Sequence, residues 1–325
     1  AKPKLVYHRL AKHVASAEAA SAFLDLGPDD RLLLSLPAWH VGGLSMLFRS
    51  LVSGAALCTP PPGMPLHEAL ATFRPTQVSL VATQLKRLLD DEDAMQHLRA
   101  CRTVLMGGGP TPEALRVEAL DAGIPLAVGY GATETCAFVA ATRDADLVRQ
   151  EDVAGPALPG REIVLDGAAR IAVGSPTLLD GYLEDGGLVS PLDDAGRFPT
   201  GDVGTLTDGI LRVHGRADRV FISGGENVQP EEIEEALLAI DGVDEAVVVP
   251  VSDAEFGQRP VAFIAGEALD ADALDAALRA ELAGFKAPDA YYRMPERPEG
   301  ALKPDLRMLH ALANDALAAS RLERL

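Results

Sequence analysis

Short apolar runs alternate with helix-like segments between Arg31 and Val128, and this alternation restricts the fold more than any other feature. Each change carries a turn or helix-cap signal of the kind found between strands and helices. The apolar runs predict strands at residues 32–36, 55–58, 77–81, 103–106 and 125–128. Helices are predicted between them at 67–73, 84–89 and 112–121, the last with Thr111 as N-cap and Pro112 at its first position. The pattern predicts a parallel sheet covered on both faces, with ligands at the carboxyl ends of its strands.

The sequence pattern changes after residue 160, where Gly and Asp interrupt short segments of alternating apolar and polar residues. Strands at 162–165, 170–173 and 210–213 predict a small antiparallel β barrel or sheet. A second, smaller α+β unit follows, with predicted strands at 220–222, 245–251 and 261–264 and helices at 230–239 and 271–282. We therefore predict a domain at 1–214, with its parallel sheet to about residue 155 and its barrel at about 156–214, a hinge at 215–219 and a second domain at 220–325.

Charge and cysteine content exclude several classes of protein. The 325 residues carry a formal net charge of -19, which disfavours nucleic acid and anionic membrane surfaces as partners. No apolar stretch reaches the roughly 20 residues that span a bilayer, and the first residues lack a signal-peptide pattern. Cys58, Cys101 and Cys136 are too few and too scattered for a disulfide framework or a zinc site. We expect them in the core of a soluble, cytoplasmic protein.

Two glycine-rich segments follow predicted strands and suggest a nucleotide site. Gly107, Gly108 and Gly109 would let a flat ring or a phosphate lie on the backbone, although a plain strand-to-helix turn explains them equally well. The segment 129–134 adds Gly129, Tyr130, Gly131, Thr133 and Glu134 in fixed order. Tyr130 would stack on a base, Thr133 would donate to a phosphate, and Glu134 would hold magnesium. The alternative is a buried tyrosine and an acid at a helix N-terminus.

The ordered segments 129–134, 200–202, 215–218 and 223–227 resemble the core motifs of adenylate-forming acyl-CoA ligases. The resemblance implies a large domain followed by a mobile C-terminal lid. It implies ATP and Mg²⁺ as cofactors and a small carboxylic acid and CoA as co-substrates. The acid would attack the α-phosphate of ATP to give an acyl-adenylate and pyrophosphate, and the CoA thiol would then displace AMP. Segments 36–45 and 79–85 resemble the o-succinylbenzoate-CoA ligases of menaquinone biosynthesis.

The resemblance also assigns roles outside these glycine segments. Lys303 would be the catalytic lysine that bridges the acyl carboxylate and the α-phosphate, with Leu302 standing where the family has glycine. Asp202 would accept the ribose hydroxyls, and Arg216 would bind ribose or phosphate oxygens unless it forms an ordinary salt bridge near the hinge. Asp218 matches the hinge position.

The remaining assignments concern the acyl and CoA ends of the site. Gly224 and Gly225 would let pantetheine pass. His40 matches the family's histidine motif and would gate or line the acyl pocket, the alternative being a buried structural histidine. Ser45 and Thr83 would serve a second substrate carboxylate, while Arg49 would equally pair with a surface acid. The acidic run at 90–93 is interpreted as an exposed helix end or loop, and the acidic residues of 231–235 as favourable to the N-terminal half of a helix, both without chemistry.

The start of the chain departs from the family pattern. Lys4 matches the terminal lysine of the phosphate-binding loop, whose hydroxyls and glycines do not precede it. A further subdomain precedes that loop in the family, so the sequence is expected to match the C-terminal part of a complete enzyme. A missing N-terminal segment and a homodimer stay open. A ligase for another aryl or acyl carboxylate and a non-catalytic nucleotide- or acyl-adenylate-binding fragment are the alternative functions.

Overall fold

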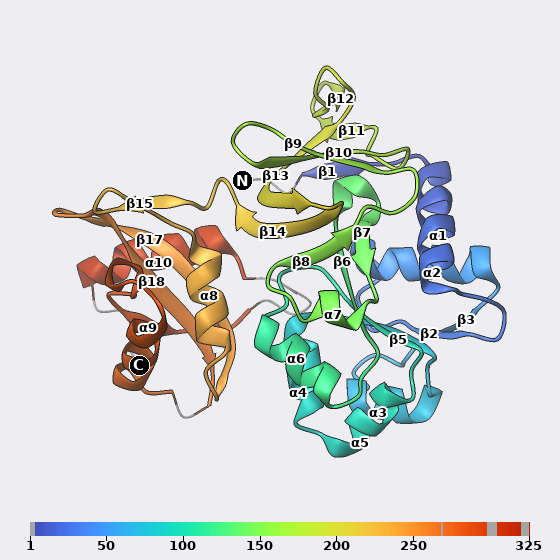
Figure 1. Ribbon diagram of the computed structural model, residues 1–325, viewed down its shortest axis with the longest axis horizontal. Helices are drawn as coiled ribbons and strands as arrows, with labels where there is room; N and C mark the ends of the chain where they lie inside the picture. Colours follow the sequence, from blue (N-terminus) through green and yellow to red (C-terminus); the bar gives the residue numbers. More distant parts are fainter. Residues whose placement is uncertain (1–3, 268, 298–303, 320–324) are drawn as a thin grey trace. The chain divides into compact units, whose positions relative to one another are not determined.

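The computed structural model describes residues 4–267, 269–297, 304–319 and 325 (Figure 1). The chain divides into two compact units, residues 1–213 and residues 214–325. The predicted domain limits and the hinge at 215–219 stay predictions.

The first unit is built on a six-stranded sheet in the order β3-β2-β4-β5-β6-β7 (Figure 1). The first five strands are parallel and β7 is antiparallel to β6. Their bounds are β2 Arg31–Leu33, β3 Ala56–Cys58, β4 Gln77–Leu80, β5 Thr103–Met106, β6 Leu126–Ala132 and β7 Ala137–Thr142. The predicted parallel sheet is confirmed. Strand β2 stops three residues short of the predicted end because Ser35 N bonds back to the Leu33 carbonyl and Pro37 has no amide N–H to donate.

Helices cover both faces of this sheet, as predicted. Alternate residues of one strand point to opposite faces. Val104 and Met106 pack on one face with helices α3 to α6, whereas Leu105 packs on the other with α1. The helix bounds are α1 Leu10–Leu24, α2 Val41–Ser53, α3 Leu66–Phe73, α4 Ala82–Leu89, α5 Glu92–Arg99, α6 Glu113–Asp121 and α7 Ala145–Val148.

The predicted start of α6 is wrong by one residue. Pro112 is the N-cap, with φ -51° and ψ 142°, and the helix begins at Glu113 without a side-chain cap. Thr111 lies between two prolines, and a residue before proline avoids the helical region. Its carbonyl instead accepts a hydrogen bond from the buried Arg116 guanidinium.

Two antiparallel sheets complete the first unit, and the predicted change from parallel to antiparallel strands is confirmed. The larger sheet has the order β8-β14-β13-β10-β9, and among the described residues β8 and β9 are its two edge strands. The smaller one has the order β1-β11-β12. The bounds are β1 Leu5–Tyr7, β8 Val153–Pro156, β9 Glu162–Leu165, β10 Arg170–Gly174, β11 Gly181–Glu184, β12 Gly187–Val189, β13 Phe198–Thr207 and β14 Ile210–Arg216.

The second unit is a smaller α+β fold with its own core. Helices α8 and α9 pack on one face of a sheet in the order β16-β15-β18-β17, and α10 packs on the other. Strand β19 joins β18 in parallel. The bounds are β15 Phe221–Ser223, β16 Glu226–Val228, α8 Pro230–Leu238, β17 Val243–Asp253, β18 Gly257–Gly266, α9 Ala271–Glu281, β19 Tyr291–Arg293 and α10 Leu306–Ala319.

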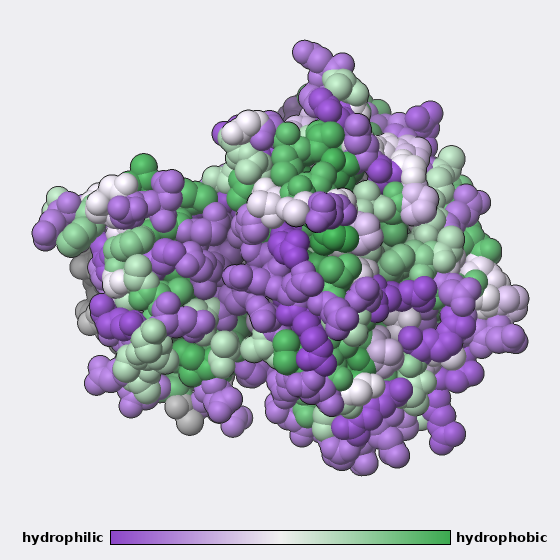
Figure 2. All heavy atoms as spheres, in the orientation of Figure 1, coloured by the Kyte–Doolittle hydropathy of each residue, from purple (hydrophilic) through white to green (hydrophobic). Residues whose placement is uncertain are grey.

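Burial and surface agree with the composition. Cys58, Cys101 and Cys136 are buried and carry free thiols, as predicted. Most of the surface seen in Figure 2 is hydrophilic. None of the helices in the described ranges is both long enough and apolar enough to cross a bilayer.

Candidate active site

The predicted site residues of the first unit gather at one edge of the parallel sheet. Neighbouring strands β2, β4, β5 and β6 all point their carboxyl ends to this edge. His40 precedes α2, Thr83 lies in the first turn of α4, and Gly107–Gly109 follow β5. Tyr130 lies near the end of β6. The topology therefore brings these four segments to the place where open α/β sheets bind ligands.

Tyr130 and Asp202 form a direct contact. The Tyr130 hydroxyl donates to the Asp202 Oδ2 at 2.5 Å. Asp202 comes from β13, and its amide donates to the Thr200 hydroxyl, which fixes the strand locally. The predicted base-stacking ring and the predicted ribose acceptor are thus held against each other, with both side chains half-buried.

The segment after Tyr130 turns sharply and presents two polar side chains. A Cβ atom on Gly131 would lie 2.1 Å from the Ala137 carbonyl oxygen, so only glycine fits there. A single 3₁₀ turn, Thr133–Thr135, follows. Thr133 is exposed and, within the described residues, its hydroxyl has no hydrogen-bond partner. Glu134 is half-buried, and its Oε1 accepts the Tyr182 hydroxyl at 2.8 Å.

The backbone beyond this turn is strained. Cys136 and Ala137 have φ values of 60° and 85°, a region that residues with a Cβ rarely adopt. Such strain persists only where surrounding contacts hold the chain in place. The Cys136 carbonyl accepts the Ser16 hydroxyl, and the Thr135 carbonyl accepts the Thr177 hydroxyl.

Tyr182 and His8 were not predicted as site residues from the sequence, although each contacts the Thr133–Glu134 turn. His8 Nε2 donates to the Thr133 carbonyl at 2.7 Å. Burial lowers the pKa of His8, which favours the neutral ring. Neither residue belongs to a recognisable motif, and their partners are remote in sequence. Only the polar aromatic residue in Leu179-Asp180-Gly181-Tyr182 offered a signal.

The alternative in which Arg49 pairs with a surface acid is contradicted, because the structure buries its side chain. Its side chain lies over the Phe138 ring, 5.0 Å from the centroid, and Nη2 donates to the Ser45 hydroxyl at 3.1 Å. Within the described residues its Nε has no partner and no carboxylate forms an ion pair with it. Burial lowers the pKa of Arg49 to about 10. A buried guanidinium without a carboxylate is expensive unless a ligand supplies one.

His40 and Lys4 occupy different parts of the unit. His40 is exposed at the N-cap of α2, which contradicts the alternative of a buried structural histidine. Lys4 is exposed just before β1, with its ammonium 4.6 Å from the Tyr182 ring centroid. Lys4 thus lies beside the residue that bonds Glu134.

The predicted residues of the second unit have local explanations. Arg216 binds Asp218 in a bidentate ion pair, with Nε–Oδ1 2.9 Å and Nη2–Oδ2 3.0 Å. The Arg216 hydrogen bond, opposed by partial burial, lowers the pKa of Asp218. Gly224 and Gly225 form the two-residue turn between β15 and β16, with φ values of 60° and 89°. Positive φ at both positions is what such a hairpin turn requires.

A partly buried charge cluster follows the Arg216–Asp218 pair. Arg219 donates to Glu231 at 2.8 Å and to Glu234 at 2.5 Å, and the Val248 amide donates to Glu234. Burial opposes the charge, but the two carboxylates raise the pKa of Arg219. Glu231 and Glu234 lie in the N-terminal half of α8, as expected, and in addition form ion pairs with Arg219 that the sequence did not indicate.

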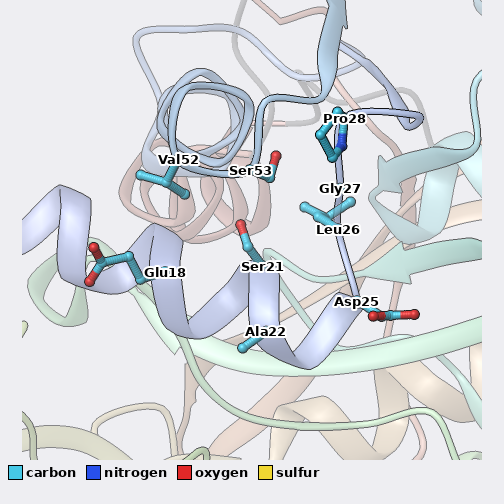
Figure 3. A pocket seen from close by; sticks show the side chains of 9 residues that line it. All are labelled: Glu18, Ser21, Ala22, Asp25, Leu26, Gly27, Pro28, Val52 and Ser53. Atoms are coloured by element: carbon cyan, nitrogen blue, oxygen red, sulfur yellow. The ribbon is translucent and has the colours of Figure 1, made fainter.

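The predicted catalytic residue Lys303 lies outside the described residues. Figure 3 shows a pocket of about 380 Å³ between α1 and α2, lined by Glu18 and Ser21, by the turn after α1, and by Val52 and Ser53. The predicted site residues are absent from this lining in the described chain.

Comparisons with known proteins agree with the geometry. The AMP-binding enzyme family matches residues 1–183, and the AMP-binding enzyme C-terminal domain matches residues 232–301. The 2-succinylbenzoate–CoA ligase of Salmonella typhimurium is 40% identical over 311 residues, which are 94% of this chain and 65% of that protein.

Two solved structures from Bacillus subtilis are similar. Both are o-succinylbenzoate coenzyme A synthetase (MenE). The complex with the acyl-adenylate intermediate OSB-AMP has a TM-score of 0.84 at 28% identity, and covers 100% of this chain and 68% of that chain. The complex with ATP and magnesium ion has a TM-score of 0.82 at 29% identity, and covers 95% of this chain and 67% of that chain. The chain therefore belongs to the AMP-binding enzyme family.

Proposed function

We propose that this chain is the larger part of an ATP-dependent acid–thiol ligase that converts o-succinylbenzoate to o-succinylbenzoyl-CoA. The chain spans 65% of the length of the Salmonella ligase, so the activity belongs to the complete protein. The main support for this substrate is Arg49, whose buried guanidinium lies beside Ser45 and has no carboxylate partner among the described residues. A dicarboxylic acid would react through one carboxylate and pair its other one with Arg49.

Residues near the carboxyl ends of the parallel strands support the proposal that the protein binds ATP. Tyr130 would stack on the adenine, Asp202 would accept the ribose hydroxyls, and Gly107–Gly109 would leave room for the ring. The Thr133 hydroxyl would donate to a phosphate oxygen, and Lys4 would bind the outer phosphates. Because Tyr130 and Asp202 are already in contact, base and ribose contacts are positioned together.

The acidic turn fits a magnesium ion carried by ATP. The described residues contain no cluster of three or more metal-ligating side chains. Magnesium usually binds through one or two carboxylates together with waters and substrate phosphates. Glu134 supplies one carboxylate, and the ion would neutralise phosphate charge during attack.

The second unit would supply the movable parts. Lys303 would bridge the carboxylate and the α-phosphate during adenylation, and Arg216 would contact ribose or phosphate once it exchanges Asp218 for the nucleotide. Rotation at Asp218 would then bring the Gly224–Gly225 turn to the path of the CoA thiol. His40 would gate the acyl pocket and Thr83 would line it.

The reaction would place the protein in menaquinone biosynthesis, in agreement with the resemblance. We also infer a cytoplasmic location, supported by three buried free thiols. A homodimer stays a prediction without a supporting contact.

Pyrophosphate release with a panel of carboxylic acids, with and without CoA, tests the proposal. We expect release with o-succinylbenzoate and thioester only when CoA is present. Preference for a monocarboxylic acid would identify another ligase, whereas ATP binding without release would identify a binding module. The variant Asp218→Pro should impair one half-reaction selectively, and unchanged rates for both would refute the hinge.

A further inference from the structure

The backbone of the Thr133–Glu134 turn is held by contacts from two distant segments. Its Thr133 carbonyl accepts His8 Nε2 at 2.7 Å, and its Glu134 carbonyl accepts the Leu179 amide at 2.7 Å. The partners lie 125 and 45 residues away in sequence, respectively. Cys136 at the end of the turn is strained at φ 60°, so the turn would not keep this shape by local preference alone.

Two of the contacts to this turn come from the paired strands β1 and β11 or from the residue next to them. His8 directly follows β1, and Tyr182 lies in β11, the strand that pairs with β1. Tyr7 opposes Gly181 in this pair, and the Asp180 amide donates to the Tyr7 carbonyl at 2.9 Å. His8 and Tyr182 are therefore positioned by the same strand pair.

Charged contacts hold one end of the β1–β11 strand pair in place. The Asp180 carboxylate accepts the Arg9 amide at 2.9 Å and the Lys12 ammonium at 2.8 Å. Lys12 also donates to the Leu178 carbonyl at 2.6 Å. These bonds tie the start of α1 to the start of β11, next to His8 on one side and Tyr182 on the other.

Each contact has a distinct chemical effect on the turn. A carbonyl oxygen only accepts, so His8 carries its proton on Nε2 and fixes the Thr133 backbone. Tyr182 donates its hydroxyl to Glu134 Oε1 at 2.8 Å, which selects one carboxylate rotamer and leaves the other oxygen for a ligand. Lys4 packs over the same Tyr182 ring, so the ring contacts both the carboxylate and a phosphate-binding lysine.

We propose that His8 and Tyr182 are positioning residues that hold the Thr133 hydroxyl and the Glu134 carboxylate for the metal–nucleotide ligand. This inference rests on the proposed function. His8 acts on the backbone of the turn and Tyr182 on its carboxylate. Removing either contact leaves the chemical groups present but poorly placed, and groups that orient metal ligands commonly change affinity or activity by about 10- to 100-fold.

Tyr182 is tested with Tyr182→Phe, which keeps the ring and removes only the hydroxyl. The matched control is Tyr7→Phe, which removes a hydroxyl from the paired strand. Binding of Mn²⁺ to the full chain with a non-hydrolysable ATP analogue is followed by electron paramagnetic resonance. We expect about tenfold weaker Mn²⁺ binding for Tyr182→Phe and unchanged binding for Tyr7→Phe. Equal Mn²⁺ affinity for Tyr182→Phe and wild type would overturn the role of Tyr182.

His8 is tested with His8→Ala and His8→Gln, because a glutamine amide N–H can replace the Nε2–H donor. His67→Gln, at an exposed helix position, is the control. We expect His8→Ala to lower kcat for pyrophosphate release at least tenfold, with a small change in the KM for the acid, and His8→Gln to recover most of the loss. Similar losses in both variants would mean that the ring only fills space.

The two proposals fail in different ways. If the complete wild-type protein binds Mn²⁺ with the nucleotide analogue but releases no pyrophosphate with any acid, the ligase proposal fails and the Mn²⁺ comparison still decides the role of Tyr182. Hydrogen exchange of the Thr133–Thr135 amides decides the role of His8 in that case. Faster exchange in His8→Ala than in His8→Gln supports it, and equal exchange refutes it.

Discussion

Tyr130 donates its hydroxyl to Asp202 at 2.5 Å, although the two residues are 72 positions apart. Tyr130 belongs to the parallel sheet and Asp202 to the antiparallel one. From the sequence, we expected each residue to contact a different part of the ligand. The structure joins them, so the orientation of one side chain depends on the other.

Loss of this bond should weaken nucleotide binding. Tyr130→Phe keeps the ring, but it removes a hydrogen bond to a charged acceptor, a bond that contributes about 1.5 to 3 kcal/mol. We expect the KM for ATP to rise at least about fivefold in Tyr130→Phe and in Asp202→Asn. The double variant should be little worse than either single one. Fully additive losses would show that the two side chains act independently.

Replacing Arg49 should separate stability from activity. Its pKa of about 10, below the ordinary 12.5, corresponds to roughly 3 kcal/mol of unfavourable burial at neutral pH. This cost is fully present below pH 10 and is relieved only as the pH rises toward 12.5. Arg49→Met should therefore stabilise the chain against urea by about 1 to 3 kcal/mol, equally at pH 7 and pH 9.

The same variant should lose the dicarboxylic substrate. We expect kcat/KM for o-succinylbenzoate to fall at least about 100-fold, because removing one partner of a buried charged pair costs several kcal/mol. Arg87→Met, at an exposed position of α4, should change neither property. Retention of full activity by Arg49→Met would remove the basis for a second carboxylate.

The Arg219 cluster should dominate the stability of the second unit. Arg219→Met leaves two buried carboxylates without their cation and should cost about 3 to 5 kcal/mol. Glu231→Gln should cost less, because the Arg219–Glu234 pair survives. The exposed Arg279–Asp275 pair is the control, and Arg279→Met should cost about 0.5 kcal/mol or less. Urea denaturation combined with hydrogen exchange of α8 measures these differences, and equal costs for Arg219→Met and Arg279→Met would contradict the cluster's role.

Lys303→Ala should affect only the first half-reaction. A positioned cation is comparable to one oxyanion-hole donor, whose loss costs about 100- to 1,000-fold in rate. We expect that loss in pyrophosphate release, while thioester formation from supplied acyl-AMP stays normal. Lys286→Ala, at a residue that pairs with Glu232, is the control. An equal loss in both half-reactions would sink the assignment.

The buried thiols should resist alkylation. Burial raises the pKa of Cys101 and of Cys136 to about 12, so both stay protonated at pH 8. The thiolate is the reactive form. N-ethylmaleimide at pH 8 should leave the native chain unmodified and label three cysteines in urea, as read by mass spectrometry. Rapid native labelling of Cys136 would show that the turn beside it opens.

The candidate site was predictable where chemistry follows a strand in sequence. Gly107–Gly109 and Tyr130 come directly after apolar runs, and neighbouring parallel strands end at one edge. Arg49 was not predictable in this way, because a helix position two residues from the exposed Leu51 can be buried against Phe138 of another element. The ion pairs of Glu231 and Glu234 with Arg219 were not predictable either, because nothing in the acidic run indicates this partner.

The sequence by itself determined the order of the main strands and helices, the change from parallel to antiparallel sheets, and most of the segments proposed to bind ligands. These features depend on local periodicity and on motifs of a few residues. Only the tertiary structure decided that Asp202 meets Tyr130, that Arg49 is buried without a carboxylate among the described residues, and that His8 and Tyr182 hold the Thr133–Glu134 turn. Those relations join residues from different elements, and burial and hydrogen bonding between them exist only once the elements have packed.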